Sequence, residues 1–240
     1  MKEFDYENEQ WTKLPPELKH LPLFTRHIDL FSFLVKQLWA LVLKGWFFNT
    51  YIRIKLHGNF EEIYKHHKKL IIISNHTSHL DAVSIAAAIP LKYWNFLYIA
   101  AAKDYFFSNP LFTFFSQHCL GAIPIDRKHH KGEAIKLCVN LMNVLENMWL
   151  IMFPEGTRST DGKIHDFKKG ISIISEKTQA PILFLYIKGG YQLWPKGRIF
   201  AIPGQLEMFI GPVQNPGARI DEIYQNYREW IKTLGYQESL

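Results

Sequence analysis

Short apolar runs alternate with helical patterns from residue 55 onward, and this alternation constrains the fold more than any other feature. The runs are four to seven residues long and rich in Ile, Leu and Phe, which is typical of buried strands. We expect strands at 70–74, 96–102, 122–125, 150–153, 182–187 and 206–210. We expect helices at 80–88, 110–118, 132–147, 170–177 and 221–234. Strands that alternate with helices form βαβ units, so the prediction is an α/β fold with a mostly parallel sheet covered by helices on both faces.

The composition fits one globular core of ordinary size. Of 240 residues, 48% are hydrophobic and 21% are charged, which excludes a disordered, collagen-like or coiled-coil chain. We divide the chain into an N-terminal tail with an amphipathic helical segment at 1–54 and a main domain at 55–240. The two cysteines, Cys119 and Cys138, match no zinc spacing and are expected to be buried thiols in a reducing compartment.

The formal net charge of +6 favours an anionic partner, such as nucleic acid, anionic lipid or a phosphorylated substrate. The sequence contains no RNP-type aromatic motif and no dense Lys/Arg tract, so we expect no nucleic-acid partner. It also has no GxxxxGK[ST] loop and no GxGxxG, so neither ATP nor a dinucleotide cofactor is indicated.

Residues 29–51 predict an amphipathic helix with a wide apolar face. At about 100° per residue, one narrow sector holds the polar and small side chains, which are Lys36, Gln37, Ala40 and Lys44. The helix could pack on the core, lie in a membrane interface or, as the minority case, span a bilayer. We favour the interface, with Lys36 and Lys44 beside lipid phosphates, because so broad an apolar face exceeds one packing contact.

A polar cluster follows the expected strand at 70–74, where the sequence reads NHTSHLD (residues 75–81, the first motif). Functional groups of parallel sheets gather at the carboxyl ends of strands. His76 and Asp81 can meet only if His76 lies in the turn and Asp81 in the first helical turn. The carboxylate would then orient the imidazole and leave its other nitrogen as a base. The alternative is that Thr77 or Ser78 caps the helix and both histidines simply pack.

A second cluster, FPEGTRS (residues 153–159, the second motif), follows the expected strand at 150–153. Gly156 permits an unusual backbone angle, and the Arg158 guanidinium suits a phosphate. Two lysines, Lys168 and Lys169, stand at the start of the helix expected at 170–177 and would add to an anion site. The alternative is a solvated turn with an exposed arginine.

Together the two motifs resemble those of the glycerolipid acyltransferases of the lysophosphatidic-acid acyltransferase type, where NHxxxxD and FPEGTRS stand about this far apart. Residues 121–127 are similar to the family's GxxFIxR segment, with Arg127 in the arginine position and Pro124 where an aromatic is common. Residues 180–183 are similar to its VPIIP segment, but Phe184 replaces the second proline. The resemblance covers about residues 55–215.

The resemblance implies a reaction and roles for residues. His76 would act as the general base and Asp81 would fix its tautomer, so that an acceptor hydroxyl attacks an acyl thioester without an acyl-enzyme. The sequence has no GxSxG elbow, which agrees with direct transfer. The predicted acceptor-binding residues are Arg127, Glu155, Gly156, Thr157 and Arg158.

The expected acceptor is lysophosphatidic acid, which would give phosphatidic acid. Glycerol-3-phosphate, another lysophospholipid or a lyso-aminolipid remain alternatives. The co-substrate is expected to be acyl-CoA or acyl carrier protein, with no cofactor. Membrane lipids are the expected partners, and the expected location is the cytoplasmic face of a membrane.

Two rival functions belong to other classes. A metal-dependent hydrolase would use His76, His79 and Asp81 with the more distant His129, His130, His165 and Asp166. Their H-x-x-H-x-D spacing matches neither HExxH nor HxHxDH, so we expect no metal and regard His79 as a neighbour of the site. The second rival is a non-catalytic lipid-binding protein that kept the fold.

Overall fold

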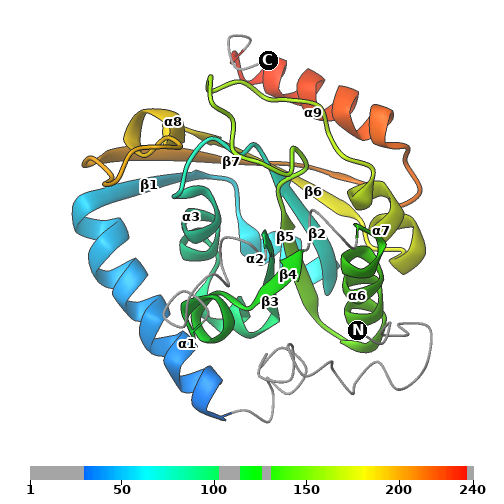
Figure 1. The fold of residues 1–240 in the computed structure, drawn as a ribbon, viewed down its shortest axis with the longest axis horizontal. Helices are drawn as coiled ribbons and strands as arrows, with labels where there is room; N and C mark the ends of the chain where they lie inside the picture. The colour runs from blue at the N-terminus through cyan, green and yellow to red at the C-terminus, as the bar shows by residue number, and fades with distance from the viewer. Residues whose placement is uncertain (1–29, 103–113, 126–130, 237–240) are drawn as a thin grey trace.

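A computed structural model describes residues 30–102, 114–125 and 131–236, which form a mostly parallel sheet between two layers of helices (Figure 1). The strands are β1 (Ile52–His57), β2 (Lys69–Ser74), β3 (Leu97–Ala102), β4 (Ala122–Ile125), β5 (Met148–Met152), β6 (Ile182–Lys188) and β7 (Gly204–Gln214). Their order across the sheet is β1-β7-β6-β2-β5-β3-β4. Neighbours are parallel except for β6 and β7, which run antiparallel. The predicted α/β class is therefore confirmed.

Helices of several lengths connect these strands. The α-helices are α1 (Leu30–Val42), α2 (Phe60–His66), α3 (Asp81–Ala88), α6 (Lys131–Val144), α7 (Gly170–Thr178), α8 (Gly190–Leu193) and α9 (Ile220–Thr233). Irregular helical turns are η4 (Leu43–Tyr51), η5 (Leu91–Phe96) and η6 (Phe115–Leu120). The helix expected at 110–118 lies partly outside the described residues, and its described part belongs to η6.

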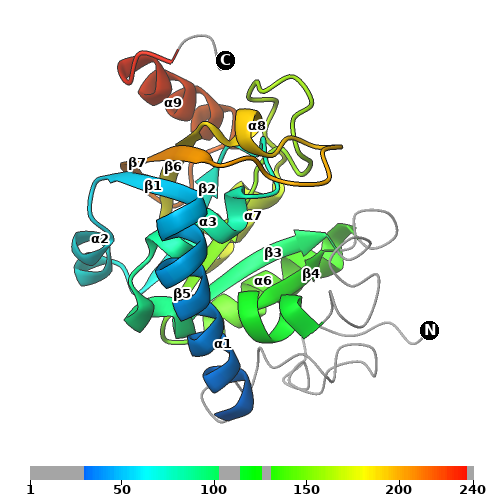
Figure 2. The same cartoon turned by 90° about the vertical axis from the view of Figure 1, so that its left-hand side faces the viewer.

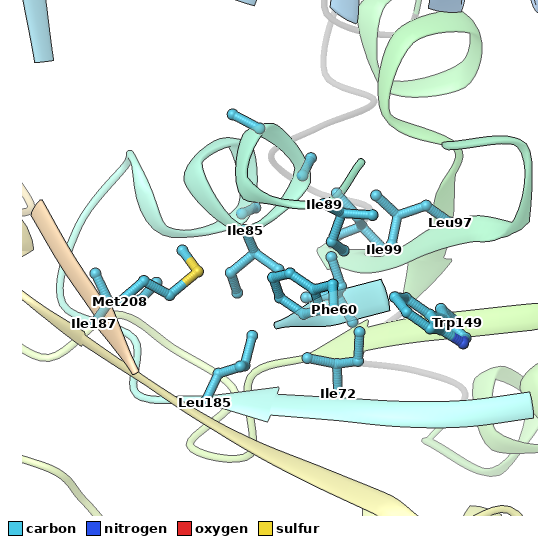
Figure 3. Close-up of a cluster of buried hydrophobic side chains, with 14 of the residues drawn as sticks. Phe60, Ile72, Ile85, Ile89, Leu97, Ile99, Trp149, Leu185, Ile187 and Met208 are labelled. Carbon is cyan, nitrogen blue, oxygen red and sulfur yellow. The ribbon is translucent and has the colours of Figure 1, made fainter. Parts of the chain in front are cut away.

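The central strand β2 shows why the sheet forms. Its four apolar residues, 70–73, are completely buried, and three of them are β-branched isoleucines that suit a pleated surface. Alternate residues face opposite sides, so Ile71 and Ile73 join a core under α6, α7 and α9. Leu70 and Ile72 join the other core, which includes residues of α1, α2 and α3 (Figure 3). Both faces of the sheet are therefore covered, as predicted.

The orientation predicted for the N-terminal helix is wrong. The Lys36 ammonium is buried and donates to Leu97 O at 3.0 Å, and Lys44 donates to Ala87 O at 2.7 Å and Ile89 O at 2.6 Å. These carbonyls at the end of α3 and the start of β3 need donors, and the apolar lysine stems can lie along the core. The lysine face therefore packs inward.

The opposite face of α1 and η4 consists of large apolar side chains that remain exposed. These residues are Leu34, Leu38, Leu41, Val42 and Trp46, with 41–65% of each exposed. We call this set the α1 stripe. No helix among the described residues is long and apolar enough to cross a membrane. The boundary placed between residues 54 and 55 falls inside β1, and the division into two parts stays a prediction.

Candidate active site

The two motifs meet because their strands are neighbours. The first motif follows β2 and the second follows β5, and these strands pair in parallel. Their carboxyl ends therefore lie at the same edge of the sheet, where sites of open α/β sheets form.

The His76 ring and the Asp81 carboxylate are in contact. His76 Nδ1 lies 2.9 Å from Asp81 Oδ2, and the same oxygen accepts the N–H groups of Thr77 (2.7 Å) and Ser78 (2.8 Å). Asp81 is completely buried at the first position of α3, and His76 lies in the turn before it, as the motif predicted. With the carboxylate ionised, Nδ1 donates the proton and Nε2 is left as a base. The catalytic roles themselves stay predictions.

The His76 ring is held from two sides. It stacks on the Phe153 ring with centroids 4.0 Å apart and planes inclined by 16°. Its side chain keeps 20% of its surface exposed, so an external molecule can reach the ring while Asp81 fixes its orientation.

The first motif is anchored by two residues to which sequence reasoning assigned no role. The Asn75 side chain donates to Ile187 O at 2.9 Å and accepts Ile187 N–H at 2.8 Å. Asn75 N donates to the Tyr227 hydroxyl at 3.0 Å, and this hydroxyl donates to Leu185 O at 2.6 Å. Asn75 could have been found as the first residue of the motif. Tyr227 carries no local signal, because its partners are 42 and 152 residues away.

Glu155 joins the two motif loops. One carboxylate oxygen accepts His76 N–H at 2.8 Å and the other accepts His165 N–H at 3.2 Å. Ser159 N donates in return to His76 O at 2.7 Å. Burial raises the pKa of Glu155 to about 7, against the opposing effect of the two backbone donors. Both oxygens are used within the protein, and the role of Glu155 in substrate binding stays a prediction.

We expect Glu155→Gln to change how stability depends on pH. The carboxyl has a pKa of about 7 in the folded protein against 4.5 ordinarily, so folding takes up a proton between these values. Its stabilising contribution is present at low pH and is lost as pH rises through this window. As pH rises through this window, the free energy of unfolding of the wild type relative to the variant should fall by on the order of 3 kcal/mol. Urea unfolding across the window measures this difference, with Glu176→Gln at an exposed position of α7 as control. A constant difference would contradict the prediction.

Arg158 from the second motif reaches the first motif. Its guanidinium contacts both ring nitrogens of His79, at 2.6 Å for Nε2. Burial, followed by the charge of Arg158, lowers the pKa of His79 to about 4, so this imidazole is neutral at neutral pH. A neutral ring can accept a hydrogen bond from the guanidinium. Arg158 is thus partly buried against His79 of the first motif and is not an isolated arginine on a solvated turn.

A lysine covers the turn of the second motif. Gly156 has φ +72°, and a Cβ at this position would lie 2.7 Å from Lys168 Nζ. Glycine is therefore required both by the backbone and by the close approach of Lys168. Thr157 is exposed on the same turn, while the predicted Arg127 lies outside the described residues.

The metal hypothesis also names residues outside the first motif. His165 lies 3.1 Å from Asp161, on an exposed loop, while His129 and His130 lie outside the described residues. Within the described ranges, no three or more His, Cys, Asp or Glu side chains are grouped so that they could hold a metal ion.

A cavity of about 640 Å³ lies beside the first motif. Asn75 and Thr77 line it together with Lys163 and Lys188, so its wall is polar and partly cationic. His76, Asp81 and Arg158 are not among its lining residues.

The comparison with protein families adds an independent result. The model of the acyltransferase family matches residues 53–188, more than half of the chain, and this span includes both motifs. The chain is 32% identical over 181 residues to the 1-acyl-sn-glycerol-3-phosphate acyltransferase of Limnanthes douglasii, covering 72% of this chain and 58% of that protein. It is 27% identical over 177 residues to the chloroplastic 1-acyl-sn-glycerol-3-phosphate acyltransferase BAT2 of Brassica napus, covering 73% of this chain and 47% of that protein. The chain spans about half the length of these relatives.

A solved structure has a similar fold. The 1-acyl-sn-glycerophosphate (LPA) acyltransferase PlsC from Thermotoga maritima superposes with a TM-score of 0.64 at 24% identity. The likeness covers 90% of this chain and 86% of that chain. At this identity the likeness concerns the fold, including the arrangement of the sheet.

Proposed function

Because the chain belongs to the acyltransferase family, we propose that it transfers a fatty acyl group from an acyl thioester to the free hydroxyl of lysophosphatidic acid. The product would be phosphatidic acid. The observation that carries this proposal is the hydrogen-bonded His76–Asp81 pair, with Arg158 in contact with His79 of the same motif. The names of the relatives support the choice of acceptor.

The proposed chemistry is general-base catalysis by His76. Nε2 takes the proton from the acceptor hydroxyl while the hydroxyl oxygen attacks the thioester carbonyl. The Asp81 carboxylate, held by three donors, stabilises the imidazolium that forms. The C–S bond of the tetrahedral intermediate then breaks, and the thiolate takes the proton back from the imidazolium. The products are an ester and a free thiol, and no acyl-enzyme forms.

The acceptor phosphate is proposed to bind at the second motif. Arg158 supplies a planar fork that matches phosphate oxygens, and Lys168 places a second cation over the same turn. The contact with His79 holds the guanidinium beside the first motif, so a bound phosphate would place the acceptor hydroxyl near His76. Arg127, Glu155, Gly156 and Thr157 remain predicted members of this site.

Arg158→Ala should lower kcat/KM for lysophosphatidic acid by about 10–100-fold, because charge-assisted hydrogen bonds to phosphate are lost. KM for the acyl donor should change little. Arg158→Lys should recover only part of the loss, since the bidentate fork is missing. Steady-state kinetics with each substrate varied in turn provides the measurement. A loss of affinity for the donor instead of the acceptor would reverse the assignment.

One assay tests the activity and the identity of both substrates. Purified full-length protein is offered labelled acyl-CoA or acyl carrier protein together with each acceptor, and mass spectrometry identifies the products. The acceptor panel contains lysophosphatidic acid, glycerol-3-phosphate, other lysophospholipids and lyso-aminolipids. Phosphatidic acid formed from lysophosphatidic acid supports the proposal, and acylation of another acceptor alone would replace it.

We also propose that the protein attaches to the cytoplasmic face of a membrane through the α1 stripe. Inward packing of Lys36 and Lys44 leaves this stripe outward, with Trp46 among its residues. Such a surface suits the boundary between headgroups and acyl chains, where a lipid acceptor would be met.

A further inference from the structure

A second apolar surface lies in the segment between α8 and β7, residues 194–203, which we call the tip loop. Ile199 and Phe200 are each 78% exposed, and Ile202 is 46% exposed. Single exposed apolar residues are ordinary on protein surfaces, but three large ones within four residues form a patch. In Figure 2 the segment that joins α8 to β7 extends away from the sheet.

Hydrogen bonds at its base hold the tip loop in this shape. Ile202 N donates to Leu193 O at 3.0 Å, and Trp194 Nε1 donates to Arg198 O at 2.9 Å. The Arg198 guanidinium donates to Gln192 O at 3.1 Å. The backbone is thus fixed while the side chains of Ile199 and Phe200 are left in solvent, although burying either would be favourable.

The charge around the tip is positive. Lys196 and Arg198 are exposed directly before Ile199. No aspartate or glutamate occurs from residue 177 to residue 206. An apolar tip with adjacent cations complements the surface of an anionic bilayer, where acyl chains lie beneath phosphate groups.

The tip loop is joined to the end of η4. The Tyr51 hydroxyl donates to Ala201 O at 2.8 Å, and Tyr51 itself is 38% exposed. The tip loop therefore adjoins the helical segment that carries the α1 stripe. A bilayer that contacts both the tip loop and the α1 stripe would hold the protein at a fixed angle. Contact through the helix alone would leave the protein free to rotate about the helix axis.

We propose that the tip loop inserts into an anionic lipid bilayer as a second membrane contact, alongside the α1 stripe. This goes beyond the proposed attachment by α1 and can be measured without catalysis. Trp194 O at the base of the loop accepts His79 N–H at 3.1 Å and the Ser78 hydroxyl at 2.9 Å. Insertion of the loop would therefore hold the bilayer beside the first motif, so that a lipid acceptor need not pass through water.

The first test measures binding of the full chain to vesicles of equal parts phosphatidylcholine and phosphatidylglycerol by sedimentation. The double variant Ile199→Ser/Phe200→Ser should bind at least about tenfold more weakly, because two buried apolar side chains are lost. The matched control, Ile199→Val/Phe200→Leu, should bind like the wild type. Acylation of a water-soluble short-chain acceptor should be unchanged in both variants, which separates this inference from the proposed reaction.

The charged residues are tested on the same vesicles. Lys196→Gln/Arg198→Gln should weaken binding by roughly tenfold at low salt and should have no effect on phosphatidylcholine alone. The control is Lys177→Gln/Lys232→Gln, which removes two exposed charges from α7 and α9. If both double variants weaken vesicle binding equally, only the net charge of the protein matters. This result would overturn the specific role of the tip loop.

Insertion can also be observed directly with a label at residue 200. Burial raises the pKa of the native thiols Cys119 and Cys138 to about 12, so neither competes for a thiol reagent. A polarity-sensitive probe on Phe200→Cys should shift to an apolar signal when vesicles are added, and the same probe on Lys177→Cys should not. A water-exposed signal at residue 200 in vesicle-bound protein would overturn the proposal.

Two further outcomes would also overturn it. If Leu38→Ser/Leu41→Ser abolishes vesicle binding while the tip-loop variant binds normally, α1 alone is the anchor. If analytical ultracentrifugation shows a wild-type dimer that the tip-loop variant cannot form, with unchanged vesicle binding, the patch is an interface between copies of this chain.

Discussion

His76→Ala should lower turnover by roughly 10²–10⁴-fold, because general-base catalysis contributes a factor of this size. The variant should remain folded. The ring stacks on Phe153 and is partly exposed, while the backbone N–H and C=O of residue 76 keep their bonds to Glu155 and Ser159. Initial rates with lysophosphatidic acid and acyl-CoA provide the measurement, and circular dichroism checks the fold.

The matched control for this change is His66→Ala on α2. His66 is exposed and lies 3.3 Å from Glu62 on the same helix, so the substitution should leave turnover unchanged. Near-normal turnover in His76→Ala would exclude the proposed base. A wild type that shows no turnover at all would instead favour the rival function, a non-catalytic lipid-binding protein.

Asp81→Asn should lower turnover by roughly 10²–10³-fold with little change in the acceptor KM. An amide oxygen can still accept the N–H groups of Thr77 and Ser78, so the loop should keep its shape. The negative charge that stabilises the imidazolium is lost, and this loss is the reason for the slower turnover. The two backbone donors hold the amide oxygen in the place of Oδ2, so the amide nitrogen takes the place of Oδ1, which is buried without a partner among the described residues.

A double variant distinguishes this role from a general structural effect. If Asp81 acts through His76, then His76→Ala/Asp81→Asn should be no slower than His76→Ala alone, because residues that act as a unit are not additive. Independent, multiplied losses in the double variant would show that Asp81 contributes in another way. Thermal unfolding of all three variants reports any loss of stability.

Local sequence patterns were sufficient to predict most strands of the sheet. β2 and β6 are continuous apolar runs, and only a strand buried on both faces tolerates such a run over so short a length. The edge strand β1 was missed, because its half-exposed pattern of alternating residues is weak and lies directly after a helical pattern. The antiparallel pairing of β7 with β6 could not be predicted either, since the direction of a strand depends on the path of the connection before it, here residues 189–203.

In the candidate site, too, some contacts follow from the local sequence and others depend on the tertiary structure. His76 and Asp81 are five residues apart, so a turn followed by a helix was enough to bring them together. The contact between Arg158 and His79 spans 79 residues, as does the bond from His76 N to Glu155. Only the parallel pairing of β2 with β5 brings these residues together, and no local pattern encodes it.

The sequence by itself determined the fold class, the positions of both motifs and the amphipathic character of the N-terminal helix. Only the tertiary structure decided which face of that helix packs on the core. Lysine has an apolar stem and a charged end, so Lys36 and Lys44 fit either lipid phosphates or buried carbonyls. The carbonyls of Leu97, Ala87 and Ile89 become available as partners only when α3 and β3 lie beside the helix. Hydrophobic periodicity defines two faces of a helix, but the unsatisfied groups of its neighbours decide which of them turns inward.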